Sequence, residues 1–180
     1  MNIFEHNRIM IIGNNGGGKS TLAKGLAAIT GLPLVHLDAI YWLPDLQAPP
    51  EDEWLRLHAE IIAGEKWVID GNYRQGGTLE PRWAAADLVI HLEVNRLVCL
   101  AGAVIRNCKA RPDDGPREFK QSFDRRFFTM CRAIWDYSRA RRDKLLAPRE
   151  RYPDTPFFVI KGRRNMRRLL KEWNKEAQQC

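Results

Sequence analysis

The sequence predicts an α/β fold in which a parallel β-sheet is covered by helices on both faces. Short apolar segments alternate with longer amphipathic segments along the 180 residues, and this alternation is typical of parallel strands joined by crossover helices. No stretch rich in proline, glycine or serine divides the chain, and its length suits one hydrophobic core. We therefore expect one three-layer domain spanning residues 1–180.

Four segments in the first part of the chain predict buried strands because they are short and continuously apolar. They are residues 8–13, 34–38, 67–71 and 87–94. Helices are expected between them. The first, 19–30, repeats Leu22, Leu26 and Ile29 at helical spacing and ends at Gly31. The others are 51–64, with three acidic residues in its first turn, and a short helix at 78–86.

The second part of the chain predicts three helices and one further strand. Residues 95–110 form a helix, and a polar segment, 111–122, follows it. A long helix is expected from about 123 to 146, because Phe127, Cys131 and Ile134 recur on one face. A fifth strand at 157–161 and a basic helix at 165–179 complete the pattern.

The segment GNNGGGKS, residues 13–20, fits the phosphate-binding pattern G-x-x-x-x-G-K-[S/T] in full. Glycines let several backbone N–H groups turn towards one anion, and the following helix directs the positive end of its dipole at it. Lys19 is placed to reach the β- and γ-phosphates, and the Ser20 hydroxyl to bind Mg²⁺. We expect a nucleotide, ATP with Mg²⁺, to bind to these residues: Gly13, Asn14, Asn15, Gly16, Gly17, Gly18, Lys19, Ser20 and Thr21.

Two aspartates are expected at strand ends near this loop. Asp38 ends the second predicted strand and Asp70 the third, and ligands of open parallel sheets bind at the carboxyl ends of strands. Either carboxylate suits Mg²⁺ or the proton of an attacking hydroxyl, and both roles stay open for both residues. Next to Asp70, we expect Asn72, Tyr73 and Arg74 to bind an acceptor, the alternative being an ordinary surface loop.

Arginines recur every seven residues along the long predicted helix, at 125, 132 and 139. Seven residues are close to two helical turns, so these side chains share one face. That face is either solvated or lies over the transferring phosphoryl group, where positive charge stabilises the transition state. On the second interpretation Arg125 and Arg132 are catalytic, and residues 111–122 form a lid that excludes water. Arg106 and Arg111 are further candidates.

The charge distribution, the apolar runs and the cysteines limit the classes of protein to which this chain could belong. The net charge is +7, but residues 1–105 hold 8 basic against 12 acidic side chains, and residues 106–180 hold 21 against 10. This asymmetry indicates a polyanion near the second part, either a nucleotide or a nucleic acid. No apolar run reaches the roughly 18 residues of a membrane helix, and no secretory signal precedes the first strand. The four cysteines lack metal-binding spacing, so we expect reduced thiols and a cytoplasmic location.

Several of these motifs, taken in order, resemble the adenylate-kinase-like small P-loop kinases. The motifs on which this resemblance rests are GNNGGGKST, LPLVHLDAIYW, WVIDGNYR, ADLVIHLEV and FFVIKGRRN. Together they look closest to those of the bacterial group called DNA topology modulation proteins. The resemblance implies a five-stranded sheet of order 2-3-1-4-5 with a movable lid. It also implies that Asp70 is linked to the metal, that Asp38 meets the acceptor hydroxyl and that Arg74 binds the acceptor. The segment 161–164, with Arg163, would touch adenine.

Two functions from different classes follow. The first is a phosphotransferase that moves the γ-phosphoryl group of ATP to a small acceptor, either a nucleotide or another metabolite. The second is a nucleotide-dependent regulator that binds DNA or RNA through the basic C-terminal half, although no known nucleic-acid motif is visible. A work-performing ATPase is the weakest interpretation, because the chain shows no appended motor element. The acceptor, the choice between ATP and GTP, and the oligomeric state stay open.

Overall fold

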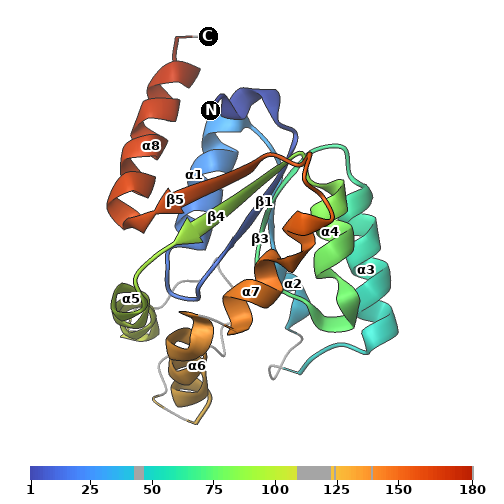
Figure 1. Cartoon of the computed structure of the whole chain (residues 1–180), viewed down its shortest axis with the longest axis vertical. Coiled ribbons are helices and arrows are strands. Elements are labelled where there is room, and N and C mark those ends of the chain that lie inside the picture. The colour runs from blue at the N-terminus through green and yellow to red at the C-terminus, as the bar shows by residue number, and fades with distance from the viewer. Residues whose placement is uncertain (43–46, 109–122, 124, 139, 180) are drawn as a thin grey trace.

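A computed structural model of the chain describes residues 1–42, 47–108, 123, 125–138 and 140–179 (Figure 1). Its centre is a five-stranded sheet with the order β2-β3-β1-β4-β5, in which every pairing is parallel. The strands are β1 (Arg8–Gly13), β2 (Leu34–His36), β3 (Trp67–Asp70), β4 (Leu88–Glu93) and β5 (Phe157–Lys161). The predicted fold class and strand order are confirmed.

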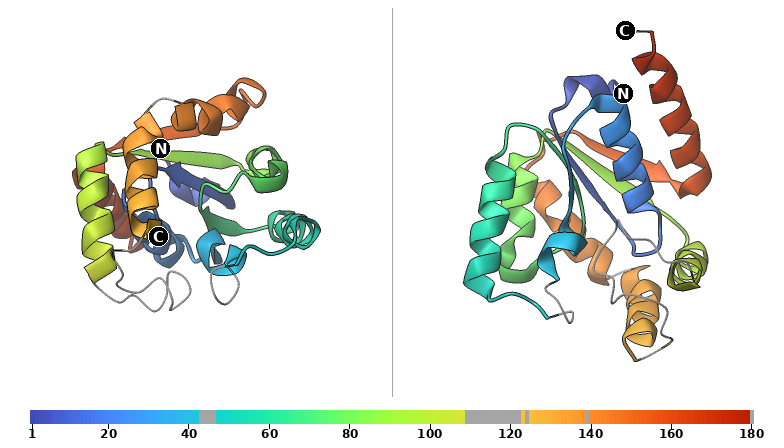
Figure 2. Two further views of the ribbon diagram at one scale, coloured as in Figure 1. Left: turned by 90° about the horizontal axis from the view of Figure 1, so that it is seen from below. Right: turned by 180° about the vertical axis from the view of Figure 1, so that it is seen from behind.

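Helices cover both faces of this sheet (Figures 1 and 2). One face packs against α1 (Lys19–Thr30) and α8 (Gly162–Ala177), and the other against α2 (Leu37–Tyr41), α3 (Glu51–Ala63), α4 (Leu79–Ala85) and α7 (Ala140–Leu146). Alternate residues of β1 serve the two cores: Ile9 and Ile11 join the first, and Met10 and Ile12 the second. This double burial explains why the strands are apolar throughout rather than alternating.

A third, smaller cluster lies beyond the carboxyl ends of the strands. There α5 (Arg96–Cys108) packs on α6 (Arg125–Trp135) through Cys99, Ala103 and Ile134, at the lower end of the molecule in Figure 1. Single turns of 3₁₀ helix complete the described structure: Ile3–Glu5, Gln75–Gly77, Asp136–Ser138 and Ala147–Glu150. None of the described helices is long and apolar enough to cross a membrane.

The structure corrects three predicted boundaries. The long helix expected at 123–146 is two helices, α6 and α7, separated by the 3₁₀ turn Asp136–Ser138. The chain must change direction there, because Ile134 of α6 packs on α5 whereas Leu145 of α7 packs on the sheet. Strand β2 ends at His36, so that Asp38 lies in α2 and not at a strand end. The last helix starts at Gly162, three residues earlier than expected. The predicted lid, 111–122, falls outside the described residues.

Candidate active site

The phosphate-binding motif forms the turn between β1 and α1. Gly18, directly before α1, has a φ of 110°, in a region that favours glycine because it has no Cβ. No side chain caps this end of α1, and its first turn, which includes Ser20 and Thr21, holds no acidic residue. The first N–H groups of α1 are therefore left to bind an anion.

Lys19 folds back over the loop that precedes it. Its Nζ donates to the carbonyl oxygen of Asn14 at 3.3 Å and to Oδ1 of Asn15 at 3.5 Å. Burial lowers the pKa of Lys19, and the negative charges of Asp70 and Asp38 act in the opposite direction. Both acids therefore lie close enough to interact with the ammonium, as the sequence predicts.

Asp70 is paired with His36, which the sequence analysis did not single out. The pairing of β2 with β3 sets the two residues side by side, each at the end of its strand, with His36 Nδ1 3.1 Å from Asp70 Oδ2. Burial would raise the pKa of Asp70, but the hydrogen bond with His36 and the charge of Lys19 outweigh it, so the pKa is lowered. Asp70 is a carboxylate that only accepts, so Nδ1 of His36 is the donor.

The same carboxylate fits a magnesium ion. Its second oxygen, Oδ1, is buried without a hydrogen-bond partner in the described structure, and the Ser20 hydroxyl is close enough to lower the pKa of Asp70 further. One carboxylate and one hydroxyl beside a phosphate loop are typical ligands of Mg²⁺. No group of three His, Cys, Asp or Glu that could hold a metal occurs among the described residues. Phosphate oxygens and water would therefore complete the coordination.

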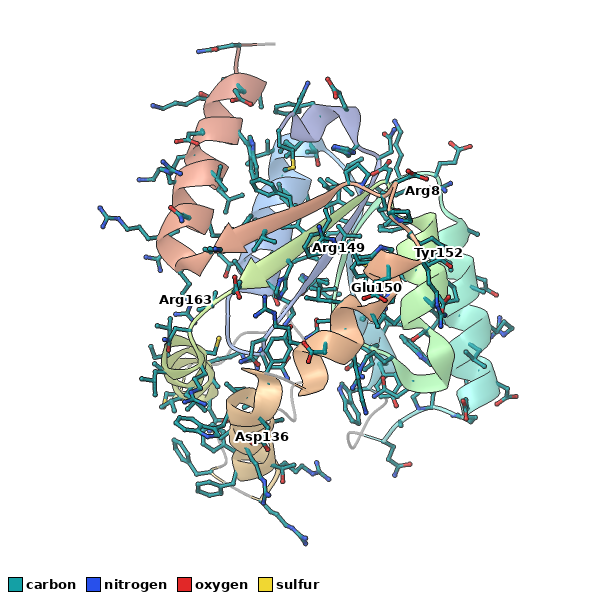
Figure 3. The ribbon with its side chains drawn as sticks, viewed as in Figure 1. Arg8, Asp136, Arg149, Glu150, Tyr152 and Arg163 are labelled. Carbon is teal, nitrogen blue, oxygen red and sulfur yellow. The ribbon has the colours of Figure 1, made fainter. Side chains whose placement is uncertain are left out.

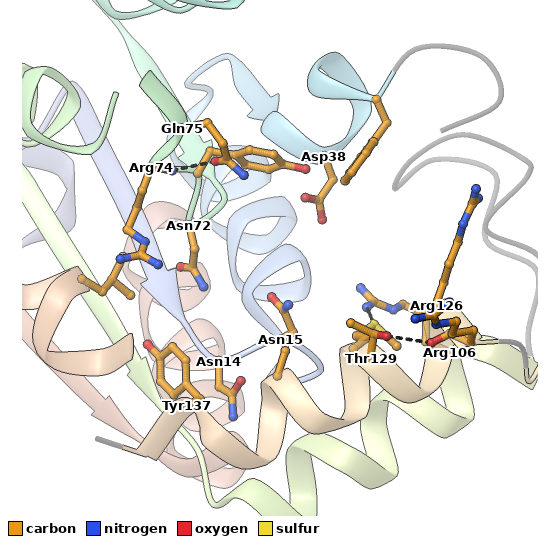
Figure 4. A pocket seen from close by; sticks show the side chains of 16 residues that line it. Asn14, Asn15, Asp38, Asn72, Arg74, Gln75, Arg106, Arg126, Thr129 and Tyr137 are labelled. Atoms are coloured by element: carbon orange, nitrogen blue, oxygen red, sulfur yellow. Dashed lines mark hydrogen bonds between the residues drawn. The ribbon is translucent and has the colours of Figure 1, made fainter. Parts of the chain in front are cut away.

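Asp38 occupies the first turn of α2 and faces a pocket (Figure 4). Tyr73 lines the same pocket and lies close enough to Asp38 for the two groups to interact. Burial, followed by the charge of Asp38, raises the pKa of Tyr73. The phenol of Tyr73 thus stays protonated beside the Asp38 carboxylate.

The residues after Asp70 hold the loop and the pocket together. Asn72 pairs with the backbone of Gly13 in both directions: its Oδ1 accepts from the N–H at 3.1 Å, and its Nδ2 donates to the carbonyl oxygen. Asn72, Tyr73 and Arg74 all line the pocket. The predicted acceptor-binding residues are therefore together, and Asn72 also positions the phosphate loop.

A buried arginine, Arg82, supports the turn after β3 that contains Tyr73. Its side chain on α4 is fully buried, and its Nη2 donates to the carbonyl oxygen of Tyr73 at 2.8 Å. Its Nη1 lies 3.4 Å from Nε2 of His58 on α3. Burial lowers the pKa of Arg82 to about 9, and burial together with Arg82 lowers that of His58 to about 4. His58 is therefore neutral near pH 7 and accepts this hydrogen bond.

The sequence itself carries a signal for Arg82, in the spacing of its apolar neighbours. Leu79, Arg82, Trp83 and Ala86 recur at i, i+3, i+4 and i+7, and all four are buried. An arginine on the apolar stripe of a helix requires buried acceptors, because charged side chains are rarely buried without partners. This position therefore marks a buried polar network beside the site.

Arginines dominate the charge of the pocket, a cavity of about 1300 Å³. Asp38 is the one acidic residue among the described residues that line it, and Asn14 and Asn15 of the phosphate loop form part of its wall. Figure 4 shows Asp38 across the open space from Arg106 and Arg126. Four of the described arginines line the cavity: Arg74, Arg106, Arg125 and Arg126.

The predicted arginine stripe is only partly at the pocket. Arg125 lines it, whereas the side chain of Arg132 is 87% exposed and lies 3.7 Å from Asp136. Arg132 belongs to the solvated face that the sequence left as the alternative. Arg111 and Arg139 fall outside the described residues.

Arg163 contacts the phosphate loop itself. Its Nε donates to the carbonyl oxygen of Gly17 at 3.1 Å, and its Nη2 donates to that of Gly16. It lies in the first turn of α8, which is helical rather than the loop that the sequence predicted after the last strand.

The comparisons with known proteins agree with this geometry at the level of the fold. Neither a protein-family model nor a curated protein sequence matches the chain. Among solved structures, a shikimate kinase from Acinetobacter baumannii in complex with shikimate is similar, with a TM-score of 0.56 and 16% identity over 98% of this chain and 96% of that one.

Two further solved structures show a comparable similarity to this chain. A gluconokinase from Sinorhizobium meliloti 1021 has a TM-score of 0.53 and 12% identity over 96% of this chain and 92% of its own. A shikimate kinase from Bacteroides thetaiotaomicron has a TM-score of 0.52 and 16% identity over 96% and 99%. The chain thus has the fold of the small P-loop kinases.

Proposed function

We propose that this protein transfers the γ-phosphoryl group of ATP to a hydroxyl group of a small anionic acceptor. One observation carries the proposal: among the described residues that line the cavity, a single acid, Asp38, faces four arginines, and the phosphate loop forms part of the wall. Solved kinases of small molecules share the fold, and the acceptor chemistry is argued from this pocket alone.

The donor half of the site consists of the phosphate loop and the residues around Asp70. The N–H groups at the start of α1 and the Lys19 ammonium hold the phosphates of ATP, and Ser20 and Asp70 hold Mg²⁺. When bound, Mg²⁺ neutralises charge on the β- and γ-phosphate oxygens. Asp70 is suited to the metal rather than to the acceptor, because its carboxylate interacts with Ser20 and Lys19 and keeps Oδ1 without a hydrogen-bond partner, while His36 occupies Oδ2.

The acceptor half is the pocket around Asp38. The acceptor oxygen attacks the γ-phosphorus, the bond between that phosphorus and the bridging oxygen of ADP breaks, and the hydroxyl proton passes to the Asp38 carboxylate. The protonated phenol of Tyr73 lies beside this carboxylate. An acceptor that carries a carboxylate or phosphate would be bound by Arg74, whose guanidinium suits such groups. Arg106, Arg125 and Arg126 supply positive charge for the transferring group.

A panel of acceptors tests this function. The protein is incubated with Mg²⁺-ATP and with nucleoside monophosphates, nucleosides, hydroxy acids or sugar phosphates, and the release of ADP is followed. We expect one anionic class to stimulate ADP release, and Asp38→Asn to lower the stimulated rate by at least 10²-fold, the lower end of what a general base contributes. Acceptor-independent ADP release that is equal in Asp38→Asn would contradict the proposal.

A further inference from the structure

Arg163 makes hydrogen bonds to two consecutive carbonyl groups of the phosphate loop. Its Nε binds the oxygen of Gly17 and its Nη2 the oxygen of Gly16. Figure 3 places Arg163 at the end of α8 that lies near α5, and Arg163 is not among the described residues that line the pocket.

These two bonds fix the peptide groups that shape the loop. In a trans peptide the C=O and the following N–H point in opposite directions. Holding the carbonyl of Gly17 against Arg163 therefore turns the N–H of Gly18 to the other side of the loop. The peptide group between Gly16 and Gly17 is held at both ends, because its N–H donates to the carbonyl oxygen of Asn14 at 3.2 Å.

Space for the guanidinium depends on a glycine of α5. A Cβ at Gly102 would overlap both the Arg163 guanidinium and the carbonyl oxygen of Gly16. Met166, one turn along α8, lies beside Gly18 and is itself buried. Elements far apart in the sequence thus meet at the phosphate loop: α8 supplies the guanidinium donor of Arg163, and Gly102 of α5 leaves the space that this donor occupies.

We propose that Arg163 is a positioning residue that sets the shape of the phosphate loop and does not recognise the base of the nucleotide. This differs from the sequence expectation, in which the segment after the last strand touches adenine. The inference rests on the proposed function only in that the loop must bind phosphate. It predicts that Arg163 affects every ligand with a pyrophosphate group equally.

Calorimetric titration with pyrophosphate, ADP and GDP, each with Mg²⁺, tests this. For Arg163→Gln we expect all three affinities to fall by a common factor of about tenfold or more, since two charge-assisted hydrogen bonds are lost, and the ratio of ADP to GDP affinity to stay unchanged. Arg163→Lys keeps the positive charge but not the paired N–H donors of the guanidinium, so we expect its affinities to lie between those of the unaltered protein and those of Arg163→Gln. The neighbouring exposed residue provides the control, Arg164→Gln, which should bind as the unaltered protein does.

The possible outcomes distinguish a failure of the inference about Arg163 from a failure of the proposed function. Loss of ADP affinity with unchanged pyrophosphate affinity would show a base contact and overturn this inference alone, as would unchanged affinities in Arg163→Gln. Failure of the unaltered protein to bind pyrophosphate and ADP would overturn the proposed function as well. Gly102→Ala gives a second test that keeps Arg163, and we expect the same common loss for all three ligands. A thermal unfolding scan of each variant establishes that it is folded.

Discussion

Single residues at this site act in pairs whose members lie far apart in the sequence. His36 is hydrogen-bonded to Asp70, Tyr73 lies beside Asp38, and Asn72 is hydrogen-bonded to Gly13. Among the described residues, the side chain of His36 has no hydrogen-bond partner other than Asp70, since its Nε2 is buried without one. The polar role of His36 is therefore directed at the carboxylate that we assign to the metal.

Replacement of His36 tests that assignment. In His36→Asn we expect the gain in ADP affinity that Mg²⁺ provides to shrink by about tenfold, because a partner that orients a metal-binding carboxylate typically contributes this much, whereas ADP affinity without metal should change little. Calorimetric titration with and without Mg²⁺ measures both. His6→Asn is the matched control, because His6 also pairs with an aspartate, Asp87, at 3.7 Å, but away from the site. An undiminished effect of Mg²⁺ in His36→Asn would contradict the assignment.

At the scale of elements, the turn after β3 is held by two helices of one face of the sheet. Arg82 of α4 and His58 of α3 form one buried chain of hydrogen bonds to the carbonyl oxygen of Tyr73, to which the hydroxyl of Thr78 also donates at 3.4 Å. The ring of Tyr73 packs near those of Tyr41 and Trp54, with centroids 4.5 and 5.6 Å away. The acceptor side of the site is thus built into the core.

Truncation of Arg82 should destabilise the fold. Arg82→Ala leaves a cavity and removes the main donor to the Tyr73 carbonyl, so we expect the free energy of unfolding to fall by roughly 2–4 kcal/mol. Arg56→Ala on α3 removes an exposed arginine paired with Glu60 at 2.8 Å and should cost less than about 1 kcal/mol. Urea denaturation of both variants provides the comparison. Equal, small losses would show that Arg82 does not support the turn.

Much of this arrangement could be predicted from the sequence, because it depends on residues that are close together in the chain. The phosphate motif sits between a buried strand and a helix, so its structure depends on neighbouring residues alone. His36 and Arg82 were missed because their partners lie on other elements, and only the strand register or the packing of α3 on α4 brings them together. The break between α6 and α7 was missed for the same reason, since both segments have helical periodicity and only their packing partners differ.

At the scale of the whole molecule, positive charge gathers in two places. One is the pocket with its four arginines, and the other is the exposed face of α8, where the basic residues include Arg164, Arg167, Arg168, Lys171 and Lys175. The excess charge of the second half is thus only partly explained by the proposed anionic substrates. Nucleic-acid binding through α8 stays the alternative proposal, and steep salt dependence of duplex binding would support it.

Two buried histidines make the stability of the whole molecule depend on pH. Burial lowers the pKa of both His58 and His91 to about 4, with help from Arg82 and Arg142 respectively. Both are protonated more readily in the unfolded chain, near pH 6.5, so their contribution is present above that pH and is lost as the pH falls from 6.5 towards 4.

We expect the free energy of unfolding to fall by on the order of 3 kcal/mol between pH 7 and pH 4.5 through these two groups together. Urea denaturation at a series of pH values measures this. His91→Gln should reduce the dependence, since it removes one of the two groups. A stability that is constant over this range would contradict the burial of both rings in neutral form.

The fate of the γ-phosphoryl group tests the central claim most directly. The protein is incubated with Mg²⁺-ATP labelled in that group and with a mixture of small hydroxy acids and phosphorylated metabolites, and the labelled products are separated. We predict label in an organic phosphate ester, its formation strongly reduced in Asp38→Asn although Mg²⁺-ATP still binds. Label found only in inorganic phosphate, at the same rate in both proteins, would contradict the assignment of this site to phosphoryl transfer.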